Sequence, residues 1–279
     1  MNYELSSQQN EVNIQSVTST IPHRLRARLL HVVSTETVGP HMQRLTLGGA
    51  QLEEDFPVVS MAPDDHVKLM FPDPTTGVIS LPEIVDGRPV RRKESAPLMR
   101  DYTVRALRSA GLVIDFLRHE HGPAGRWAID ARVGDQLGVV GPRGSRVYPN
   151  DFNRYVLVAD ESGFPAIARW LEEPTLQAAI EVYVFGEGSD EYPLPERRNT
   201  NITWLDHPIG ERRNGVLRDL GETLELSDDL FIWATGESES LAEFRKGVRE
   251  RGFSRAHQHF SGYWRIGVAG ARLRDEDGD

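Results

Sequence analysis

The apolar pattern of this chain changes in kind near residues 149–153. Before that point, from Arg24 to Gly141, short runs rich in Val, Leu, Ile and aromatic residues are separated by Gly, Pro and Asp. This spacing is typical of a small β-barrel or sandwich. From Tyr155 onward, short apolar runs alternate with helical patterns, which indicates a parallel sheet with helices on its faces. The sequence therefore predicts a β-barrel followed by an α/β domain.

The expected elements follow from these runs. In the first part, strands are expected over residues 25–33, 42–47, 66–71, 102–107, 112–117 and 136–140. In the second part, strands over 155–159, 180–185 and 230–234 should alternate with helices over 164–172 and 238–251. A polar stretch rich in Ser, Gln, Asn and Thr precedes them. We therefore expect a flexible lead (1–21), a barrel domain (22–150) and an α/β domain with a C-terminal segment (151–279).

The chain contains no cysteine. Disulfides, thiolate nucleophiles, cysteine-ligated iron–sulfur clusters and cysteine-based zinc sites are thereby excluded. Any redox chemistry must come from a bound cofactor.

The formal net charge of −10 argues against binding to nucleic acid, because neutralising phosphates requires a basic face. The first 16 residues are polar and lack the apolar segment of a secretory signal. No stretch approaches 18 uninterrupted apolar residues, so no membrane span is expected. We expect a cytoplasmic protein, and the oligomeric state is left open.

The segment Arg-Asp-Tyr-Thr-Val-Arg stands at residues 100–105, at the start of an expected strand. Arg100 offers a fork of donors suited to phosphate. Tyr102 points the same way along a strand and supplies a flat face for a ring, and Thr103 adds a hydroxyl. The segment is consistent either with a ligand site or with an ordinary amphipathic strand.

The segment His-Glu-His-Gly-Pro-Ala-Gly-Arg-Trp-Ala occupies residues 119–128. Gly122 and Gly125 permit close backbone approach, and Pro123 suits the first turn of a helix. Free N–H groups at such a helix start form an anion site that would fit a diphosphate. The two histidines would suggest a metal, but no third ligand with suitable spacing follows, so no metal site is predicted.

Two further segments lie between an expected strand and an expected helix, where α/β proteins bind ligands. They are Ala-Asp-Glu-Ser-Gly-Phe-Pro-Ala-Ile-Ala at 159–168 and Thr-Gly-Glu-Ser-Glu-Ser at 235–240. Near the C-terminus, Gly-Tyr-Trp-Arg at 262–265 places an aromatic pair beside a cation. Each segment also has a plain structural explanation: a strand-to-helix turn, a helix cap at Ser238, and the packing of an edge strand.

Taken in order, these segments resemble the siderophore-interacting proteins of the ferredoxin–NADP reductase superfamily. The resemblance runs from about Leu25 to Gly267 and includes Gly-Pro-Arg-Gly-Ser at residues 141–145. It implies a six-stranded antiparallel FAD-binding barrel followed by a parallel-sheet, nicotinamide-type domain. The implied activity is that of an FAD-dependent reductase, which passes electrons from NADH or NADPH to ferric iron in siderophores and releases ferrous iron.

The resemblance also implies a cofactor site built from three regions of the chain. The residues that would hold the flavin ring and the adjoining phosphate are Arg100, Tyr102 and Thr103. Those that would line the flavin site and the ribityl and diphosphate path are Leu117, His119, Gly125, Trp127 and Ala128. Those that would close the pocket from the second domain are Asp160, Glu161 and Ser162.

Members of this family bind anionic ferric chelates through basic residues near the flavin. Lys68, Arg126 and Arg245 stand at positions that fit this role. In an acidic protein, three converging cations would steer an anionic ligand, although the same residues are also consistent with solvated surface cations. No catalytic side chain is expected, because electron transfer needs no nucleophile or general base, and the iron is a substrate.

Two alternatives remain open. One is the same fold with a ferredoxin-type protein donor, for which the basic run at residues 91–93 is a hint. The other is a siderophore-binding flavoprotein that does not turn over. The acidic residues that follow the strand over 180–185 would oppose a 2′-phosphate and so favour NADH. Phe164 is expected beside the site, where its bulk would alter access for the nicotinamide ring. The siderophore itself is not identified.

Overall fold

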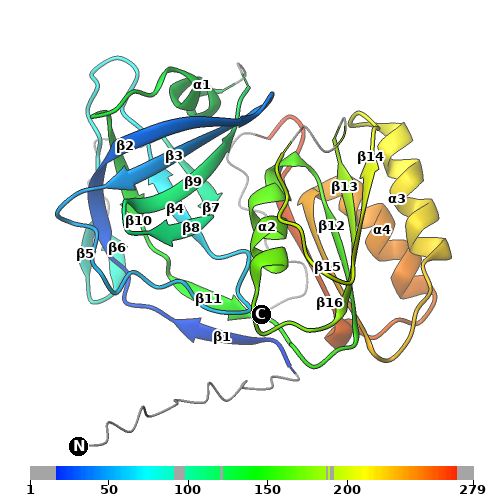
Figure 1. Ribbon diagram of the computed structural model, residues 1–279. Coiled ribbons are helices and arrows are strands. Elements are labelled where there is room, and N and C mark those ends of the chain that lie inside the picture. Colours follow the sequence, from blue (N-terminus) through cyan, green and yellow to red (C-terminus); the bar gives the residue numbers. More distant parts are fainter. Residues whose placement is uncertain (1–16, 91–97, 120–121, 187, 189–191, 269–279) are drawn as a thin grey trace, which may run out of the picture.

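The computed structural model describes residues 17–90, 98–119, 122–186, 188 and 192–268. Two sheets lie side by side, one in an N-terminal part (residues 17–150) and one in a C-terminal part (residues 151–268) (Figure 1). The first sheet is antiparallel and the second is parallel. The change of pattern near residues 149–153 therefore marks the point where one kind of sheet gives way to the other.

The antiparallel sheet has the strand order β7-β4-β10-β2-β3-β9-β8. Its strands are β2 (Ala27–Gly39), β3 (Met42–Gly48), β4 (His66–Met70), β7 (Met99–Thr103), β8 (Ala106–Arg108), β9 (Gly111–Leu117) and β10 (Gln136–Val140). Alternate side chains of these strands are buried, for example Leu45, Leu47, Val67 and Leu69. They form a core on one face of the sheet, as the period of two in the sequence requires.

Within the described residues this sheet has seven strands, where the resemblance implied six. The run over residues 102–107, expected as one strand, is divided between β7 and β8. At the break, the Val104 N–H still donates to the carbonyl of Asp65 beside β4 (2.7 Å), whereas the Arg105 N–H donates to the carbonyl of Val113 on β9 (3.0 Å). The Arg105 side chain is directed to Glu172 in the C-terminal part. The strand is interrupted because the chain changes its partner here: Met99–Thr103 pair with β4, whereas Ala106–Arg108 pair with β9.

The helix expected near Pro123 is confirmed as α1 (Pro123–Asp130) and packs against β3 and β9. Ala124 and Ala128 are buried in the core of the N-terminal part, and Arg126 is exposed. Two small pairs complete this part: β1 (Ser19–Pro22) with β11 (Gly144–Val147), and β5 (Glu83–Val85) with β6 (Arg88–Val90). The flexible lead was expected to reach residue 21, but its end forms β1, because β11 offers a ladder to pair with. Residues 1–16 lie outside the described residues.

The parallel sheet has the order β14-β13-β12-β15-β16. Its strands are β12 (Arg154–Ala159), β13 (Ala179–Phe185), β14 (Thr200–Leu205), β15 (Leu230–Glu237) and β16 (Gln258–Trp264). The helices are α2 (Phe164–Glu172), α3 (Glu211–Thr223) and α4 (Ser238–Glu250), with short 3₁₀ turns η1 (Glu161–Gly163) and η2 (Arg255–His257). None of the helices in the described ranges is both long and apolar enough to cross a membrane.

The three strands and two helices expected here are confirmed, whereas β14 and α3 were not foreseen. The sequence of β14, Thr-Asn-Ile-Thr-Trp-Leu, is mixed in polarity and only half-buried, because this strand lies at the sheet edge. The sequence of α3 is mostly polar, and its buried residues are Arg213, Leu217 and Gly221. A weak apolar stripe is sufficient here because the helix also packs through glycine and arginine.

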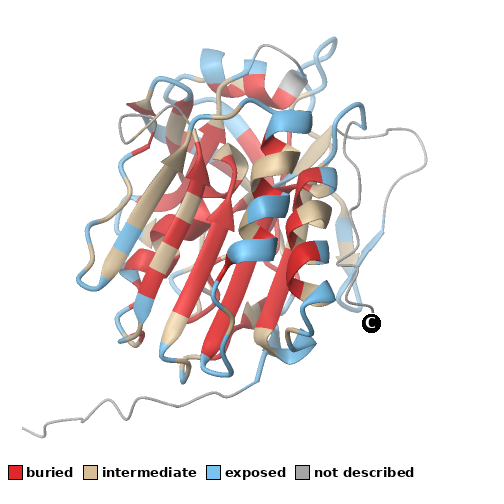
Figure 2. Cartoon of the chain, turned by 90° about the vertical axis from the view of Figure 1, so that its right-hand side faces the viewer, coloured by how far each residue is buried: buried red, intermediate tan, exposed pale blue. Residues whose placement is uncertain are grey.

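Helices cover both faces of the parallel sheet. Along β12, Tyr155 and Leu157 face the core that contains α2, and Val156 and Val158 face the core under α3 and α4. Figure 2 looks onto the α3–α4 side, where buried strands lie behind helices with exposed outer surfaces. Helix α2 lies between the parallel sheet and the N-terminal part (Figure 1).

One of the hydrophobic clusters contains residues of both parts. Val38, Met42 and Met61 of the N-terminal part belong to the same buried cluster as Trp170 on α2 and Trp233 on β15. Trp170 and Trp233 are fully buried. Burial of large apolar side chains across the junction fixes how the two sheets face each other.

Helices α3 and α4 cross at a pair of glycines. A Cβ atom at Gly247 would lie 2.8 Å from the carbonyl carbon of Gly221, and one at Gly221 would lie 2.7 Å from the carbonyl oxygen of Phe244. We expect Gly247→Ala to lower the free energy of unfolding by about 1–3 kcal/mol, because the helices must separate to admit the methyl group. Urea unfolding of the variant and the wild type measures this change.

Gly215 on α3 provides the matched control. A Cβ atom there would meet nothing within 4 Å. Gly215→Ala should therefore raise the free energy of unfolding by about 0.5–1 kcal/mol, the usual gain for alanine over glycine in a helix. Similar stabilisation by both substitutions would show that the helix crossing does not require glycine.

Candidate functional site

Strand β7 places Arg100 and Tyr102 on one face of the antiparallel sheet. Its pairing with β4 sets Tyr102 opposite Val67 and Arg100 opposite Leu69, both of which are buried. The guanidinium of Arg100 donates one hydrogen bond to the carbonyl of Met99 (2.7 Å). Burial raises the pKa of Tyr102 above its usual range, so its phenol stays protonated and can donate to an anionic group.

Helix α1 is brought to β7 by a group of four aromatic rings. The ring centres of Tyr102 and Phe116 are 4.4 Å apart, and those of Phe116 and Trp127, on α1, are 6.3 Å apart. Phe71 contacts both ends, at 6.4 Å from Tyr102 and 5.5 Å from Trp127. The two segments that the sequence singled out for a ring and a diphosphate therefore meet on one side of the N-terminal part.

The first turn of α1 packs closely against His119. A Cβ atom on Gly125 would lie 2.5 Å from the carbonyl oxygen of His119 and 2.8 Å from its ring, so only glycine fits. The helix begins after Gly122 with no side-chain cap, which leaves its first N–H groups suited to an anion. Beside His119, the buried Nε of Arg118 has no hydrogen-bond partner in the described structure. Leu117 ends β9 and packs against the core shared by the two parts.

Asp160 joins three of the segments identified in the sequence. It is buried at the carboxyl end of β12, where its Oδ1 accepts hydrogen bonds from the N–H (2.9 Å) and hydroxyl (2.5 Å) of Ser162. Its Oδ2 accepts from the Glu237 N–H (2.8 Å) and the Trp264 indole (2.9 Å). Burial raises the pKa of Asp160, and the bonds from Ser162 and Trp264 oppose this. Residues 159–168, 235–240 and 262–265 thus converge on one carboxylate.

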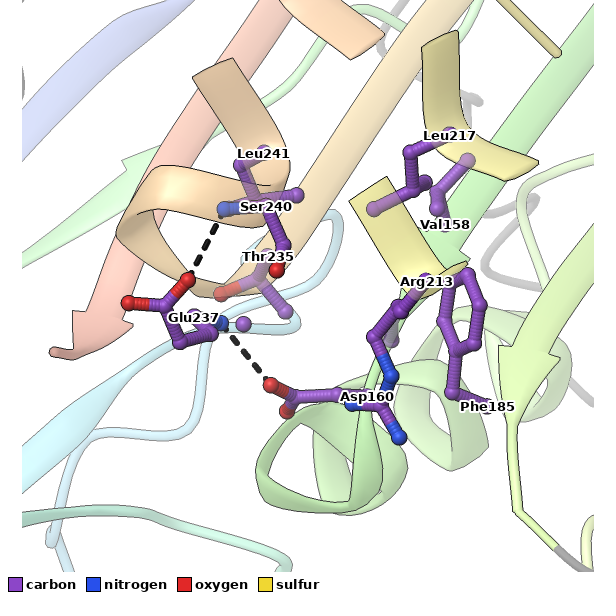
Figure 3. A pocket seen from close by; sticks show the side chains of 11 residues that line it. Val158, Asp160, Phe185, Arg213, Leu217, Thr235, Glu237, Ser240 and Leu241 are labelled. Atoms are coloured by element: carbon purple, nitrogen blue, oxygen red, sulfur yellow. Dashed lines mark hydrogen bonds between the residues drawn. The ribbon is translucent and has the colours of Figure 1, made fainter. Parts of the chain in front are cut away.

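The close approach to Asp160 explains the neighbouring glycine. Gly236 has a φ of 141°, and a Cβ atom there would lie 2.6 Å from Oδ2 of Asp160. The hydrogen bond from Glu237 to Asp160 is drawn in Figure 3, with the second bond in which the Glu237 side chain accepts from the Ser240 N–H (2.8 Å). Glu237, not Ser238, is therefore the residue that caps α4.

Glu161 is paired with a buried arginine. It accepts from Nη2 of Arg213 on α3 (3.1 Å), whose guanidinium lies 4.6 Å from the ring centre of Phe185. A small pocket lies here, at the carboxyl ends of β12, β13 and β15 and between α3 and α4 (Figure 3). Its lining includes Asp160, Phe185, Arg213, Thr235, Glu237 and Leu241. This is the edge of the sheet where α/β proteins bind ligands.

The hydrogen bonds described for Asp160, Glu161 and Ser162 are made within the C-terminal part. A direct contact of these residues with the flavin stays a prediction. Arg213 and Glu237, which support them, were missed in the sequence as site residues. The Thr-Gly-Glu segment gave a signal for Glu237, whereas no local pattern marks Arg213 because its partners come from other strands.

Phe164 does not narrow the site. Its side chain is fully buried, and its ring packs against those of Tyr192 and Trp204, with ring centres 5.5 and 5.6 Å away. The bulk of this residue therefore fills the core beside α2. The expectation that it alters access for the nicotinamide ring finds no support.

The three basic residues assigned to the siderophore lie on three separate elements. Lys68 on β4 makes a two-point ion pair with Asp101 on β7 (2.5 and 2.7 Å). Arg126 is exposed on α1, and Arg245 is half-buried on α4, which packs against α3, β15 and β16. Lys68 is therefore held on the sheet face opposite to Tyr102, and a common patch of the three cations stays a prediction.

Other expectations fall on parts of the chain that are not described. The basic run at 91–93, the hint for a ferredoxin-type donor, lies outside the described residues, and nothing in the described part supports that donor. The acidic stretch after β13 also lies largely outside them. Among the described residues, no group of three His, Cys, Asp or Glu side chains is placed to hold a metal ion.

A buried carboxylate lies directly behind the Arg-x-Tyr-Thr segment. The backbone carbonyl of Asp65 accepts from the Val104 N–H, and its Oδ2 accepts from the Ser145 hydroxyl (2.7 Å). The Oδ1 atom is buried without a partner among the described residues. Burial raises the pKa of Asp65 to about 6, against the opposing effects of Ser145 and Arg169.

This shift predicts a pH-dependent stability. Because the pKa of Asp65 in the folded protein lies above its ordinary value of 3.8, the folded state binds the proton more tightly. The stabilisation is complete below about pH 4 and is lost as the pH rises to about 6. As the pH rises through this window, the free energy of unfolding of Asp65→Asn should therefore increase relative to that of the wild type, by about 1–3 kcal/mol. Urea unfolding at pH 4, 5, 6 and 7 measures the difference.

Asp73 is the control for this experiment. It is exposed, and hydrogen bonds from Thr76 hold its pKa below the ordinary value, so its carboxylate is charged in the folded protein over most of this range. The difference between Asp73→Asn and wild type should be flat over this range. A flat difference for Asp65→Asn as well would contradict the assignment of a raised pKa to Asp65.

Two family descriptions match the chain in succession. The Siderophore-interacting FAD-binding domain matches residues 31–146, and the Siderophore-interacting protein description matches residues 152–267. The first match coincides with the antiparallel sheet and α1, and the second with the parallel sheet and its helices. Together the two matches define a protein with an FAD-binding domain followed by a siderophore-interacting domain.

Relatives match over nearly their whole length. The "NADPH-dependent ferric-chelate reductase" of Escherichia coli is 34% identical, covering 86% of this chain and 93% of its own. The "Ferric vibriobactin reductase ViuB" of Vibrio cholerae is 33% identical, covering 88% and 91%. The crystal structure of a siderophore utilization protein from T. fusca superposes with a TM-score of 0.83 at 37% identity, covering 92% of this chain and 99% of that one. The chain belongs to the siderophore-interacting protein family.

Proposed function

We propose that this chain is an FAD-dependent reductase that transfers electrons from NADPH or NADH to ferric iron in siderophores and so releases ferrous iron. The names of the Escherichia coli and Vibrio cholerae relatives support the reaction class, and the name of the Escherichia coli relative supports NADPH as the donor. The observation that carries the proposal is the meeting of β7 and α1 through Tyr102, Phe116 and Trp127. That contact joins a ring-binding strand to an uncapped helix start.

We assign the finer architecture as part of the same proposal. The antiparallel sheet would close as the flavin-binding barrel over residues 22–150, and residues 151–279 would form the nicotinamide-type domain. The succession of the two family matches, with the break between residues 146 and 152, supports this division.

The residues around β7 and α1 fit a flavin dinucleotide. Arg100 and the first N–H groups of α1 would bind the phosphates, and Tyr102 would contact the ring system. Thr103 follows Tyr102 at the end of β7 on the opposite face of the sheet, so its assignment to the ring rests on the sequence. The buried Nε of Arg118, which has no partner among the described groups, is the kind of donor that a bound ligand satisfies. Leu117, His119, Gly125, Trp127 and Ala128 would line the rest of the path. Bound FAD would supply the conversion from a two-electron donor to a one-electron acceptor.

The C-terminal part would receive the nicotinamide dinucleotide at the carboxyl edge of its sheet. Asp160 holds the three loops of that edge together through its four hydrogen bonds, and Glu161 and Ser162 lie beside it. The role of these side chains would be to orient the donor ring toward the flavin. No nucleophile or general base is needed.

Lys68, Arg126 and Arg245 would attract the anionic ferric chelate. The chain carries a net charge of −10, so a local group of cations would focus the ligand toward one region of an otherwise repelling surface. Because chelators with hard oxygen donors bind ferrous iron much more weakly, reduction would release the metal.

The test is an anaerobic stopped-flow experiment on the purified protein reconstituted with FAD. We expect NADPH or NADH to bleach the flavin absorbance, and a ferric siderophore to restore it with the appearance of ferrous iron. A protein that binds no flavin, or whose flavin is reduced by neither nucleotide, would refute the proposal.

A further inference from the structure

Arg105 ends the segment Arg-Asp-Tyr-Thr-Val-Arg but does not face the flavin-binding side of β7. Its side chain is buried and makes a two-point ion pair with Glu172 at the end of α2, with both Nη–Oε distances at 2.6 Å. Its Nε donates to the hydroxyl of Tyr192 (3.2 Å). The last residue of the proposed flavin segment is therefore bound to the C-terminal part of the molecule.

The end of α2 holds the N-terminal part at further points. Arg169 donates to the carbonyls of Val104 and Val59 (both 3.2 Å). Glu173, directly after the helix, accepts from the N–H of Met61 (2.7 Å) and the hydroxyl of Ser60 (2.8 Å). Arg169, Glu172 and Glu173 thus attach one helix end both to the residues that follow β7 and to the loop at 59–61.

A second set of contacts approaches Arg105 from the antiparallel sheet. Asp115 on β9 is buried, and its carboxylate accepts two hydrogen bonds from Arg44 (2.7 and 2.8 Å) and one from the Tyr192 hydroxyl (2.5 Å). Tyr192 belongs to the C-terminal part and reaches both Asp115 and Arg105. The guanidinium of Arg105 therefore lies between Glu172 and Tyr192 of the C-terminal part and Asp115 of the antiparallel sheet, whose Oδ2 is 4.0 Å from its Nε.

Helix α2 connects this junction to the other half of the proposed site. It begins at Phe164, directly after Asp160 and the turn η1, and it ends at Glu172. Its nine residues span about 14 Å at 1.5 Å per residue. A displacement at the Arg105–Glu172 end would therefore be carried along a packed helix to the carboxyl edge of the parallel sheet.

We propose that Arg105 is a positioning residue that sets the distance between the nicotinamide and flavin sites. The inference rests on the function proposed above, in which one hydride, two electrons with one proton, passes from the nicotinamide ring to the flavin. Arg105 would contact neither ring, because its side chain is buried against Glu172 and Tyr192. It fixes the strand that would carry the flavin to the helix that follows Asp160, and transfer rates fall steeply when reacting groups are displaced by about 1 Å.

The test compares Arg105→Gln and Glu172→Gln with the wild type. We expect each to lower the rate of flavin reduction at saturating NADPH by about 10-fold or more. Dissociation constants for FAD and NADPH, and the rate at which the chemically reduced protein reduces a ferric siderophore, should change by less than about threefold. The double variant should be no slower than the slower single variant, because both substitutions remove the same contact. Arg105→Lys keeps the charge but not the two-point geometry, so its rate of flavin reduction should lie between those of the wild type and Arg105→Gln.

If the arginine variants fail to fold, Glu172→Gln still tests the proposal. Glu172 is about half exposed, with 47% of its side chain accessible, so its replacement is expected to leave the fold intact. Glu181→Gln is the matched control. It breaks an ion pair with Arg154 that lies entirely within the C-terminal part, and it should leave flavin reduction unchanged.

The outcomes separate the two proposals. Reduction of the wild-type flavin by neither nucleotide would overturn the proposed function, and the positioning role with it. Normal reduction of the wild type together with wild-type rates in Arg105→Gln and Glu172→Gln would overturn the positioning role alone. Equal losses in both half-reactions would also overturn it, since they would indicate general damage to the fold.

Discussion

Arg100→Glu is expected to weaken FAD binding by about 10- to 100-fold. A charge-assisted hydrogen bond to a phosphate contributes about 1.5–3 kcal/mol, and the substitution replaces this donor with a like charge. Arg100 lies on the same face of β7 as Tyr102, and one of its N–H groups donates to the carbonyl of Met99. Titration of the flavin-free protein with FAD, followed by flavin fluorescence, measures the dissociation constant.

Arg255→Glu makes the same change of charge far from β7. Arg255 is exposed in η2, next to the start of β16 at the amino edge of the parallel sheet. The FAD dissociation constant of Arg255→Glu should stay within about twofold of the wild-type value, because a solvent-exposed charge on another sheet is screened. Equal affinity in Arg100→Glu and wild type would remove Arg100 from the cofactor site.

Asp115→Ala is expected to lower the free energy of unfolding by about 3–5 kcal/mol. The carboxylate is fully buried and accepts hydrogen bonds from Arg44 and from Tyr192. Removing it leaves Arg44, whose side chain is only 11% exposed, without its anionic partner, and an uncompensated buried charge is costly. Urea unfolding followed by tryptophan fluorescence measures the change.

Asp228→Ala serves as the control for this measurement. Asp228 is exposed in the turn before β15, so its replacement should change the free energy of unfolding by no more than about 0.5 kcal/mol. A loss of less than about 1 kcal/mol in Asp115→Ala would show that Arg44 finds another partner when the carboxylate is absent.

The strand that carries Asp115 was predictable, but the role of Asp115 was not. The run Leu-Val-Ile-Asp-Phe-Leu is apolar enough to indicate a buried strand despite its single charge. The partners of that charge, Arg44 and Tyr192, lie 71 and 77 residues away in the chain. No local pattern relates them, so a buried ionic cluster that joins the two parts could not be predicted from the sequence.

The candidate site divides in the same way. Tyr102 and Trp127 stand in segments whose residue types already indicated a ring and a diphosphate, and the fold brings those segments together. Asp160 was expected to close the flavin pocket, and the structure uses all the hydrogen bonds described for it to hold Ser162, Glu237 and Trp264. A carboxylate at the end of a strand can face a ligand or its own neighbours, and only the arrangement of those neighbours decides which.

The sequence by itself determined the two kinds of sheet, the change between them near residues 149–153, and most of the strands and helices. These follow from apolar periodicity and from Gly and Pro, which act over a few neighbouring residues. The tertiary structure alone decided that the strand over residues 102–107 breaks, that Phe164 turns into the core, and that Arg105 binds Glu172. Each of these depends on which distant groups become neighbours when two buried faces pack together, and burial and ionic pairing are properties of that packing.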